Sequence, residues 1–322
     1  MINEKSISVI IPAYNEELLI EKTINTMPDE ADILIIVNDA SKDNTKKVVE
    51  NLQKTNEKIL LINHEKNEGV GSALITGYKK SLELNYDISV VMPGDAQALP
   101  KDFLNIVNPV ANDLVDYSKG NRLKHKDVKK IMPRYRLIGN TLLTLFTKFA
   151  SGYFHIMDPQ MGYTALKNNM LKKIEIDNLI RRYGYPGHLL HMLNIEDARV
   201  CDVDITPHYG EEKSGLRLWN ILPKLFFLLI YLFFRRVFKK FITRNLSPAG
   251  ISYLLSFIIL LVVEPILLLR LQNLYEINQT VPELTLMLVL NFLIIFLVLF
   301  LFGLMFDVQE NKDISIKKII NE

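Results

Sequence analysis

Residues 7–16 read ISVIIPAYNE, an apolar, largely β-branched run that ends in a polar turn. The same pattern returns at residues 33–37, 59–62 and 88–92, each time followed by a polar turn and a segment with helical spacing. Runs of this kind favour strands, and strands that alternate with helices form a mostly parallel sheet covered by helices. The sequence therefore predicts an α/β fold.

The four turns form the predicted functional region, because ligands of open α/β sheets bind beyond the carboxyl ends of the strands. They read PAYNE at 12–16, NDASKDNT at 38–45, HEKNEGVGSA at 64–73 and PGDAQ at 93–97. Backbone N–H groups at the first turn suit an anion, and Tyr14 can pack on a ring. Asp39 can accept hydrogen bonds from a nucleoside, with an ordinary capped turn as the alternative. Asp95 is a natural ligand for Mg²⁺ or Mn²⁺.

Two glycines, Gly69 and Gly71, precede the third predicted helix. A dinucleotide-binding fingerprint needs its glycines after the first strand and a third glycine in register, and neither condition holds here. The alternative is close backbone packing at the start of that helix.

Bulk properties argue against several classes of protein. The 322 residues include 38 Lys and Arg against 36 Asp and Glu, so the net charge of +2 gives a nucleic-acid partner no support. Cys201 is the single cysteine, which rules out an intrachain disulfide and favours a reducing compartment. The N-terminus lacks the basic region and cleavage site of a signal peptide and is predicted to form the first strand.

The composition changes near Trp219, where long apolar stretches begin. Residues 225–234 are too short to cross a bilayer, and residues 234–244 place apolar and basic side chains on opposite helical faces. This pattern predicts a helix in the membrane interface, with an ordinary solvated basic face as the alternative. The predicted basic face consists of Arg235, Arg236, Lys239, Lys240 and Arg244.

Residues 251–269 and 284–306 are each long enough to span a bilayer, and together they predict a transmembrane hairpin. Its connection holds one Arg and two Glu, whereas both flanks are rich in Lys and Arg, so the positive-inside rule places the flanks in the cytosol. We expect an α/β domain at 1–218, interfacial juxtamembrane helices at 219–246, a transmembrane region at 247–306 and a cytosolic tail at 307–322.

Taken in order, the turns resemble the family 2 glycosyltransferases, specifically the dolichyl-phosphate-mannose synthase-like branch that glycosylates polyprenyl phosphates. The resemblance runs over most of the chain and implies a GT-A, Rossmann-like nucleotide-sugar domain. The matching pieces are PAYNE at 12–16, NDASKDNT at 38–45, NEGVGSA at 67–73, GDAQ at 94–97, GNR at 120–122 and DPQMGY at 158–163.

The resemblance also implies roles for residues on the donor side. Asp95 and Gln97 match the metal and diphosphate contacts, with Mg²⁺ or Mn²⁺ as cofactor. The family has a first Asp where this chain has Pro93, so water or substrate would have to replace one ligand. The nucleotide contacts implied are Pro12, Tyr14, Glu16 and Asp39.

On the acceptor side, the resemblance implies that three arginines meet the lipid phosphate, a role that suits the forked guanidinium. These are Arg122, Arg134 and Arg136, with a solvated helix face as the alternative. Asp158 is expected to face the reacting sugar and to form the catalytic set with Asp95 and Arg122. Lys213 and Ser214 match a loop that closes over the site, and a plain linker is the alternative.

The expected function is inverting transfer of a hexosyl group from a UDP- or GDP-sugar to dolichyl or undecaprenyl phosphate. A phosphate acceptor is already an anion, so no general base is required. The protein is expected in a bacterial or archaeal plasma membrane, with a cytosolic catalytic domain and possible self-association. Two alternatives stay open: a non-catalytic membrane scaffold, and a transferase acting on a lipid-linked sugar. A processive polysaccharide synthase is disfavoured, because Trp219 is not part of a Gln-x-x-Arg-Trp motif.

Overall fold

The computed structural model describes residues 1–94, 99–123, 134–206 and 218–316, and among these it leaves the side chains of 134–138, 140 and 218–222 undescribed. The chain divides into two compact units. The first unit is Met1–Leu232 together with Asp313–Glu322, and the second is Phe233–Lys312. The expected division into an α/β domain, interfacial helices, a transmembrane region and a cytosolic tail stays a prediction. The two units are defined by contacts within the chain and say nothing about a membrane.

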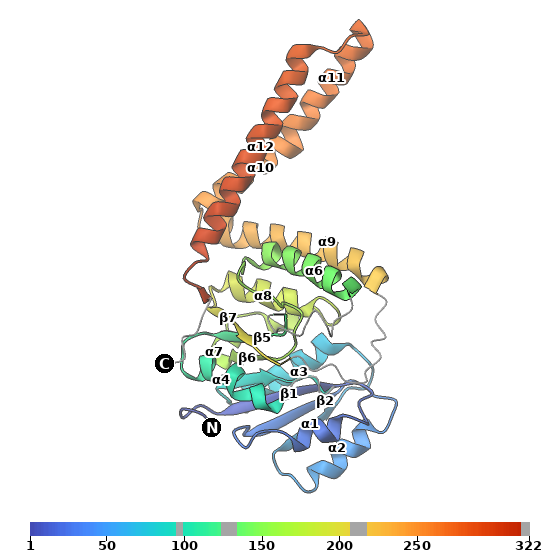
Figure 1. Ribbon diagram of the computed structural model, residues 1–322, viewed down its shortest axis with the longest axis vertical. Helices are drawn as coiled ribbons and strands as arrows, with labels where there is room; N and C mark the ends of the chain where they lie inside the picture. Colours follow the sequence, from blue (N-terminus) through green and yellow to red (C-terminus); the bar gives the residue numbers. More distant parts are fainter. Residues whose placement is uncertain (95–98, 124–133, 207–217, 317–322) are drawn as a thin grey trace. The chain divides into compact units, whose positions relative to one another are not determined.

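The first unit is built on a sheet that contains eight strands among the described residues, in the order β3-β2-β1-β4-β6-β5-β7-β8 (Figure 1). β6 is antiparallel to both of its neighbours, and the other pairs are parallel. The predicted mostly parallel sheet is therefore confirmed. The strands are β1 (Ile7–Ala13), β2 (Ile33–Asn38), β3 (Ile59–Asn63), β4 (Ile88–Val91), β5 (Tyr117–Asn121), β6 (Thr164–Lys167), β7 (Val200–Asp204) and β8 (Ser315–Ile316).

Helices cover both faces of this sheet. Val9 and Ile11 of β1 belong to one buried cluster with Phe103, whereas Ile10 belongs to another with Leu74. Successive strand side chains point to opposite faces, so alternate β1 residues enter two separate cores and the strand is buried on both sides. The described helices of this unit are α1 (Ile20–Asn25), α2 (Thr45–Gln53), α3 (Val70–Glu83), α4 (Phe103–Ala111), α6 (Arg134–Ser151), α7 (Asn168–Leu171), α8 (Tyr185–Ile195) and α9 (Leu218–Arg236), with single turns at Pro100–Asp102 and Ile176–Asn178.

The strand order reverses at β1. The chain proceeds from β1 to β2 and β3 on one side and then returns to place β4 on the other side of β1. A reversal of this kind leaves a crevice outside the carboxyl ends of the two strands that flank it. The turns after β1 and β4 therefore meet at one place.

Gly69 and Gly71 at the start of α3 lie against the backbone of another segment, so only glycine fits at these positions. This is the close backbone packing that the sequence offered as the alternative to a dinucleotide-binding fingerprint. A Cβ on Gly71 would lie 2.0 Å from the Ile180 carbonyl oxygen, and one on Gly69 would lie 2.6 Å from the Arg181 carbonyl oxygen. Gly69 also has a φ of 100°, which favours glycine. The segment 180–182 therefore lies directly against the start of α3.

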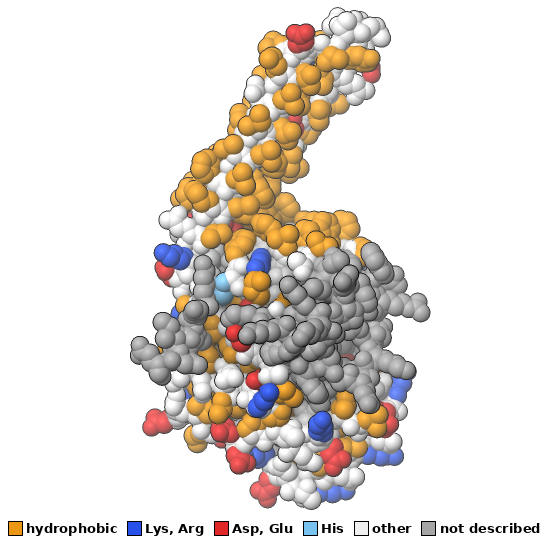
Figure 2. Space-filling view, viewed as in Figure 1, with side chains coloured by type: hydrophobic (Ala, Val, Ile, Leu, Met, Phe, Trp, Pro, Cys, Tyr) orange, Lys and Arg blue, Asp and Glu red, His pale blue; other side chains and the backbone are white. Residues whose placement is uncertain are grey.

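The second unit is a helical hairpin, and hydrophobic side chains cover much of the face that Figure 2 shows. Two of its helices, Pro248–Asn278 and Glu283–Glu310, are long and apolar enough to cross a membrane by length and composition. They contain both predicted spans. At Gly303 a Cβ would lie 2.7 Å from the Tyr253 ring, so the glycine lets the helices approach closely. The elements of this unit are the end of α9, a π-helical segment at Val237–Arg244, α10 (Pro248–Ile258), a second π-helical segment at Ile259–Val263, α11 (Glu264–Asn278) and α12 (Glu283–Glu310).

Two of the five cations that were predicted to form an interfacial basic face at 234–244 are buried, which corrects the prediction for Arg236 and Lys240. Arg236 is 0% exposed, and its guanidinium pairs with both carboxylate oxygens of Asp307, at 2.8 and 2.6 Å. The buried Lys240 ammonium donates to the Asn311 side chain at 2.8 Å. A buried cation needs a partner, and these partners lie 71 residues further along the chain. The sequence of the segment alone does not reveal these partners.

We predict that Gly71→Ala lowers the free energy of unfolding by about 1–3 kcal/mol, because the new methyl group overlaps the Ile180 backbone. Chemical denaturation of the purified protein in detergent measures this change.

The matched control is Gly139→Ala in α6, where an added Cβ meets nothing within 4 Å. We expect this substitution to leave stability unchanged or to raise it by up to about 1 kcal/mol, as alanine favours a helix. Equal effects of the two substitutions would contradict the packing argument.

Candidate functional site

A cavity of 670 Å³ lies at the carboxyl ends of β1, β2 and β4. Its walls come from segments that are far apart in the chain, and most of the lining residues lie at the ends of the predicted strands or directly after them. This volume suits a ligand of nucleotide size. The lining residues fall within 12–16, 67–73, 91–94, 160–162 and 182–185, together with Asp39 and Arg122.

The turns after β1 and β2 are joined by hydrogen bonds. The Asn15 side-chain oxygen accepts from the Lys42 N–H at 2.8 Å, and the Asn15 N–H donates to the Ser41 hydroxyl at 3.0 Å. The Glu16 N–H donates to the Thr45 hydroxyl at 2.8 Å. These contacts fix the turn that presents Tyr14 and Glu16 to the cavity.

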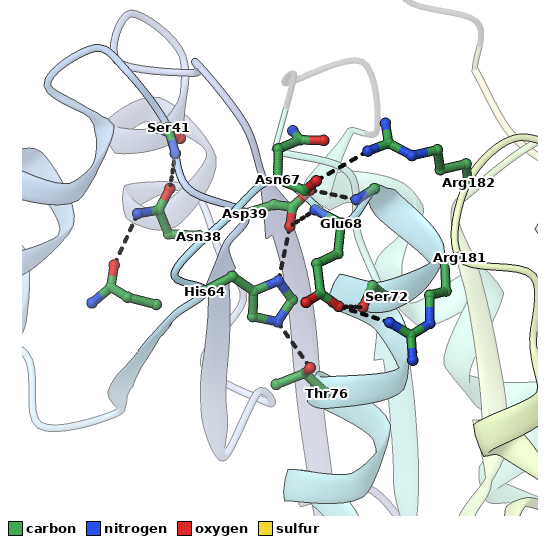
Figure 3. Close-up of polar contacts among 12 residues, drawn as sticks. Asn38, Asp39, Ser41, His64, Asn67, Glu68, Ser72, Thr76, Arg181 and Arg182 are labelled. Atoms are coloured by element: carbon green, nitrogen blue, oxygen red, sulfur yellow. Dashed lines mark hydrogen bonds and ion pairs between the residues drawn. The ribbon is translucent and has the colours of Figure 1, made fainter.

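Asp39 is the centre of a polar network at the floor of the cavity (Figure 3). Its carboxylate accepts from the Glu68 N–H at 3.0 Å and from the Gly69 N–H at 2.8 Å. His64 Nδ1 lies 2.8 Å from the same carboxylate, and His64 Nε2 lies 2.9 Å from the Thr76 hydroxyl. The Asp39 side chain is therefore held in one orientation from β3 and from the start of α3.

The opposite wall is held against α3 by two arginines, which Figure 3 shows reaching toward the turn after β3. Arg181 donates to the Glu68 carboxylate at 3.1 Å, and Arg182 donates to the Asn67 carbonyl oxygen at 3.0 Å. The Ser72 hydroxyl, followed by the Arg181 guanidinium, holds the pKa of the Glu68 carboxyl below its usual range. Glu68 therefore stays ionised and links the wall to the helix.

Arg122 and Asp158 pair with each other at the far side of the cavity. Arg122 Nε lies 2.9 Å from Asp158 Oδ2, and its Nη2 lies 3.3 Å from Oδ1. The Arg122 N–H also donates to Oδ2, at 3.3 Å. Arg122 lines the cavity, whereas Asp158 is 2% exposed and lies behind it. The carboxylate thus orients the guanidinium by a forked contact.

The structure brings five of the predicted site residues to this one cavity: Pro12, Tyr14, Glu16, Asp39 and Arg122. Asp158 pairs with Arg122 and is not among the lining residues, and its expected position facing the sugar stays a prediction. Gly94 and Pro93 line the cavity directly before Asp95. The structure does not describe the side chains of the remaining predicted residues. Asp95, Gln97, Lys213 and Ser214 lie outside the described residues, and for Arg134 and Arg136 only the backbone is described.

Three further residues at the site were missed by sequence reasoning: His64, Arg182 and Tyr183. His64 touches Asp39, and the other two line the cavity. His64 directly follows β3, so its place at a strand end was a usable signal. Arg182 and Tyr183 follow no strand. They reach the cavity because the segment 180–182 packs against Gly69 and Gly71. Within the described residues, His, Cys, Asp and Glu form no group of three that could hold a metal ion.

Comparison with known proteins gives consistent matches. The family described as glycosyl transferase family 2 matches residues 8–175. A UDP-N-acetylglucosamine–dolichyl-phosphate N-acetylglucosaminyltransferase of Methanococcus voltae is 34% identical over 71% of this chain and 96% of its own length. An undecaprenyl-phosphate mannosyltransferase of Micrococcus luteus is 25% identical over 64% of this chain and 86% of its own. Among solved structures, glucosyl-3-phosphoglycerate synthase from Mycobacterium tuberculosis has a TM-score of 0.55 at 19% identity, over 72% of this chain and 80% of that one, a likeness of fold.

We predict that Asp39→Ala lowers the free energy of unfolding by about 3 kcal/mol. The substitution leaves the Glu68 and Gly69 N–H groups and the His64 ring without their acceptor, and an unsatisfied buried donor is costly. Thermal and chemical denaturation measure the change.

Asn67→Ala is the control from the same wall, since the described contact of Asn67 is made by its backbone carbonyl. Its effect is expected to stay within about 0.5 kcal/mol. If Asp39→Ala were as mild as Asn67→Ala, the network would not organise the floor of the cavity.

Proposed function

The chain belongs to glycosyltransferase family 2 and is a glycosyltransferase with a GT-A fold, and on this premise we propose that it transfers a sugar from a nucleotide-sugar to a polyprenyl phosphate. Relatives named for transfer to dolichyl or undecaprenyl phosphate support this acceptor. The proposal includes inversion at the anomeric carbon, which rests on the family resemblance.

One observation carries the proposal. The residues expected to hold a nucleotide and the arginine expected to hold the acceptor line a single cavity, at the point where the strand order reverses. Transfer between two anionic substrates requires that both be held in line in one site. Asp39 and Arg122 belong to the two sides of such a site.

UDP-N-acetylglucosamine is the first donor that we propose. The relative named for this donor is 34% identical and is matched over 96% of its length. The base is proposed to lie at the Asp39 end, where a carboxylate fixed by three neighbours has little freedom left to lose on binding. Exposed Tyr14 and Tyr183 supply ring surface to the same cavity.

A divalent metal is proposed to bind at the turn after β4. The donor chemistry of Asp95 and Gln97, one carboxylate and one amide oxygen, fits Mg²⁺ or Mn²⁺, with water or diphosphate completing the shell. When bound, the ion would offset the negative charge of the departing nucleoside diphosphate. Pro93 and Gly94, which directly precede Asp95 in the chain, line the cavity.

Arg122 is proposed to bind the acceptor phosphate in the orientation that Asp158 gives it. A polyprenyl phosphate carries its own negative charge at neutral pH, so the acceptor oxygen needs no base to activate it. Asp158 is committed to the guanidinium. We therefore propose that Asp158 positions Arg122 and does not remove a proton.

The hairpin is proposed to cross the membrane, with the cavity on the cytosolic side. Residues before and after the hairpin both belong to the first unit, so both ends of the hairpin return to the same side. The charge distribution of the flanks then favours the cytosol. We also propose that residues 219–246 lie in the membrane interface and that the protein associates with itself.

The test is transfer with the purified full-length protein, radiolabelled nucleotide-sugars and polyprenyl phosphate in detergent. We expect labelled lipid from UDP-N-acetylglucosamine. Turnover of no nucleotide-sugar with any polyprenyl phosphate would favour the non-catalytic scaffold, and transfer only to a lipid that already carries a sugar would favour the alternative acceptor.

We predict that chelation by EDTA and the substitution Asp95→Ala each lower the transfer rate by about 100-fold or more, since each removes metal-ion stabilisation of the leaving diphosphate. Added Mn²⁺ restores the chelated enzyme but not the variant. Initial rates of lipid labelling measure both effects.

Glu264→Gln is the control, because Glu264 lies in the second unit at the start of α11 and outside the cavity. Its rate is expected within about twofold of the wild type. Full activity of Asp95→Ala would contradict the proposed metal site.

A further inference from the structure

The ammonium of Lys119 is buried beneath the cavity, and nothing in the proposed chemistry uses it. Lys119 lies in the middle of β5, opposite Thr164 of β6 and Asp202 of β7, and is 1% exposed. Its ammonium donates to the carbonyl oxygen of Met161, a residue that lines the cavity. Lysine is almost never fully buried without a charge partner, so this position calls for an explanation.

Two carboxylates supply the opposite charge. Asp158 and Asp202 both interact electrostatically with Lys119, and Arg122 adds a second cation to the group. Asp202 accepts from the Met157 N–H at 2.7 Å and from the Asn121 amide at 3.1 Å, while its buried Oδ1 has no hydrogen-bond partner among the described residues. The result is a group of two cations and two anions, in which Lys119 and Asp158 are buried and Arg122 lines the cavity.

This group holds one segment of chain, residues 157–162. The Asp202 carboxylate accepts from the Met157 N–H, the Arg122 guanidinium donates to the Asp158 carboxylate, and the Lys119 ammonium donates to the Met161 carbonyl. All three anchoring side chains come from β5, its end or β7. Gln160, Met161 and Gly162 of the segment line the cavity, so the anchors set the position of that wall.

We propose that Lys119 is a positioning residue of the transfer reaction: its buried ammonium fixes the segment 157–162, and through it the alignment of the sugar with the acceptor phosphate. This inference rests on the proposed function for its chemistry. The anchoring itself rests on the contacts described above.

The proposal has a pH signature. Burial lowers the pKa of Lys119 to about 8, an effect that Asp158 and Asp202 partly oppose. Burial also raises the pKa of Asp202 to about 7, against the Met157 hydrogen bond and the Lys119 charge. The ammonium is lost as the pH rises through about 8, so the segment should loosen above that pH. The charged groups facing Lys119 are Asp158, Asp202 and Arg122, and Lys148 of α6 faces Asp202.

The test compares Lys119→Met with wild type in the full-length protein. A neutral side chain of similar length removes the ammonium, and Asp202 can take up a proton in compensation. We expect kcat with saturating substrates to fall about 100-fold, as small misplacements of reacting groups do, while the Kd for UDP changes less than about threefold. The fall in wild-type rate above about pH 8 should be absent in the variant.

Two further variants separate positioning from charge balance. Lys167→Met is the matched control, since the Lys167 ammonium pairs with Asp113 at 2.9 Å and Asp116 at 3.2 Å, neither of which lines the cavity. It should keep wild-type kcat. The double variant Lys119→Met/Asp202→Asn restores neutrality without the anchor, and its kcat should stay low.

Hydrogen exchange over residues 157–163 gives a readout that does not need turnover. Protection there should fall in Lys119→Met and not in Lys167→Met. Wild-type kcat in Lys119→Met, recovery in the double variant, or unchanged protection would each overturn the positioning role. If the wild-type protein shows no transfer activity and Lys119→Met still loses protection over residues 157–163, the proposed function is refuted. The anchoring role of Lys119 then stands.

Discussion

The carboxylate of Asp39 accepts hydrogen bonds from the turn after β3, while His64 holds it from the side. Because β2 and β3 are adjacent parallel strands, this one group joins their carboxyl ends to the start of α3. The glycines at 69 and 71 then allow the segment 180–182 to close the wall. The shape of the cavity thus depends on a carboxylate that is already satisfied by protein before any ligand arrives.

The two sides of the cavity are held by different means. On the Asp39 side, backbone N–H groups donate to one carboxylate, and short turns are joined through the Ser41 and Thr45 hydroxyls. On the Arg122 side, the guanidinium pairs with Asp158, and the buried Lys119 ammonium interacts with Asp158 and Asp202. The first side is held mainly by backbone groups and the second mainly by pairs of charged side chains.

Sequence reasoning succeeded where the signal is local and failed where it is not. The runs at 7–11, 33–37, 59–62 and 88–92 became β1 to β4, since β-branched runs bounded by turns favour strands, and both apolar spans became helices. The turns after those strands held most of the cavity residues. Arg236 and Lys119 were not foreseen as buried, because their partners lie 71 and 42 residues away and no periodic pattern records such pairs.

β8 lies at the edge of the sheet beside β7, with Ser315 opposite Val200. A ribosome makes this strand only after the whole hairpin, so the sheet stays one strand short while the apolar helices emerge. During that interval β7 has an unpaired edge, which is a site for wrong pairing. The sheet of the first unit is therefore completed only after the whole hairpin has been synthesised.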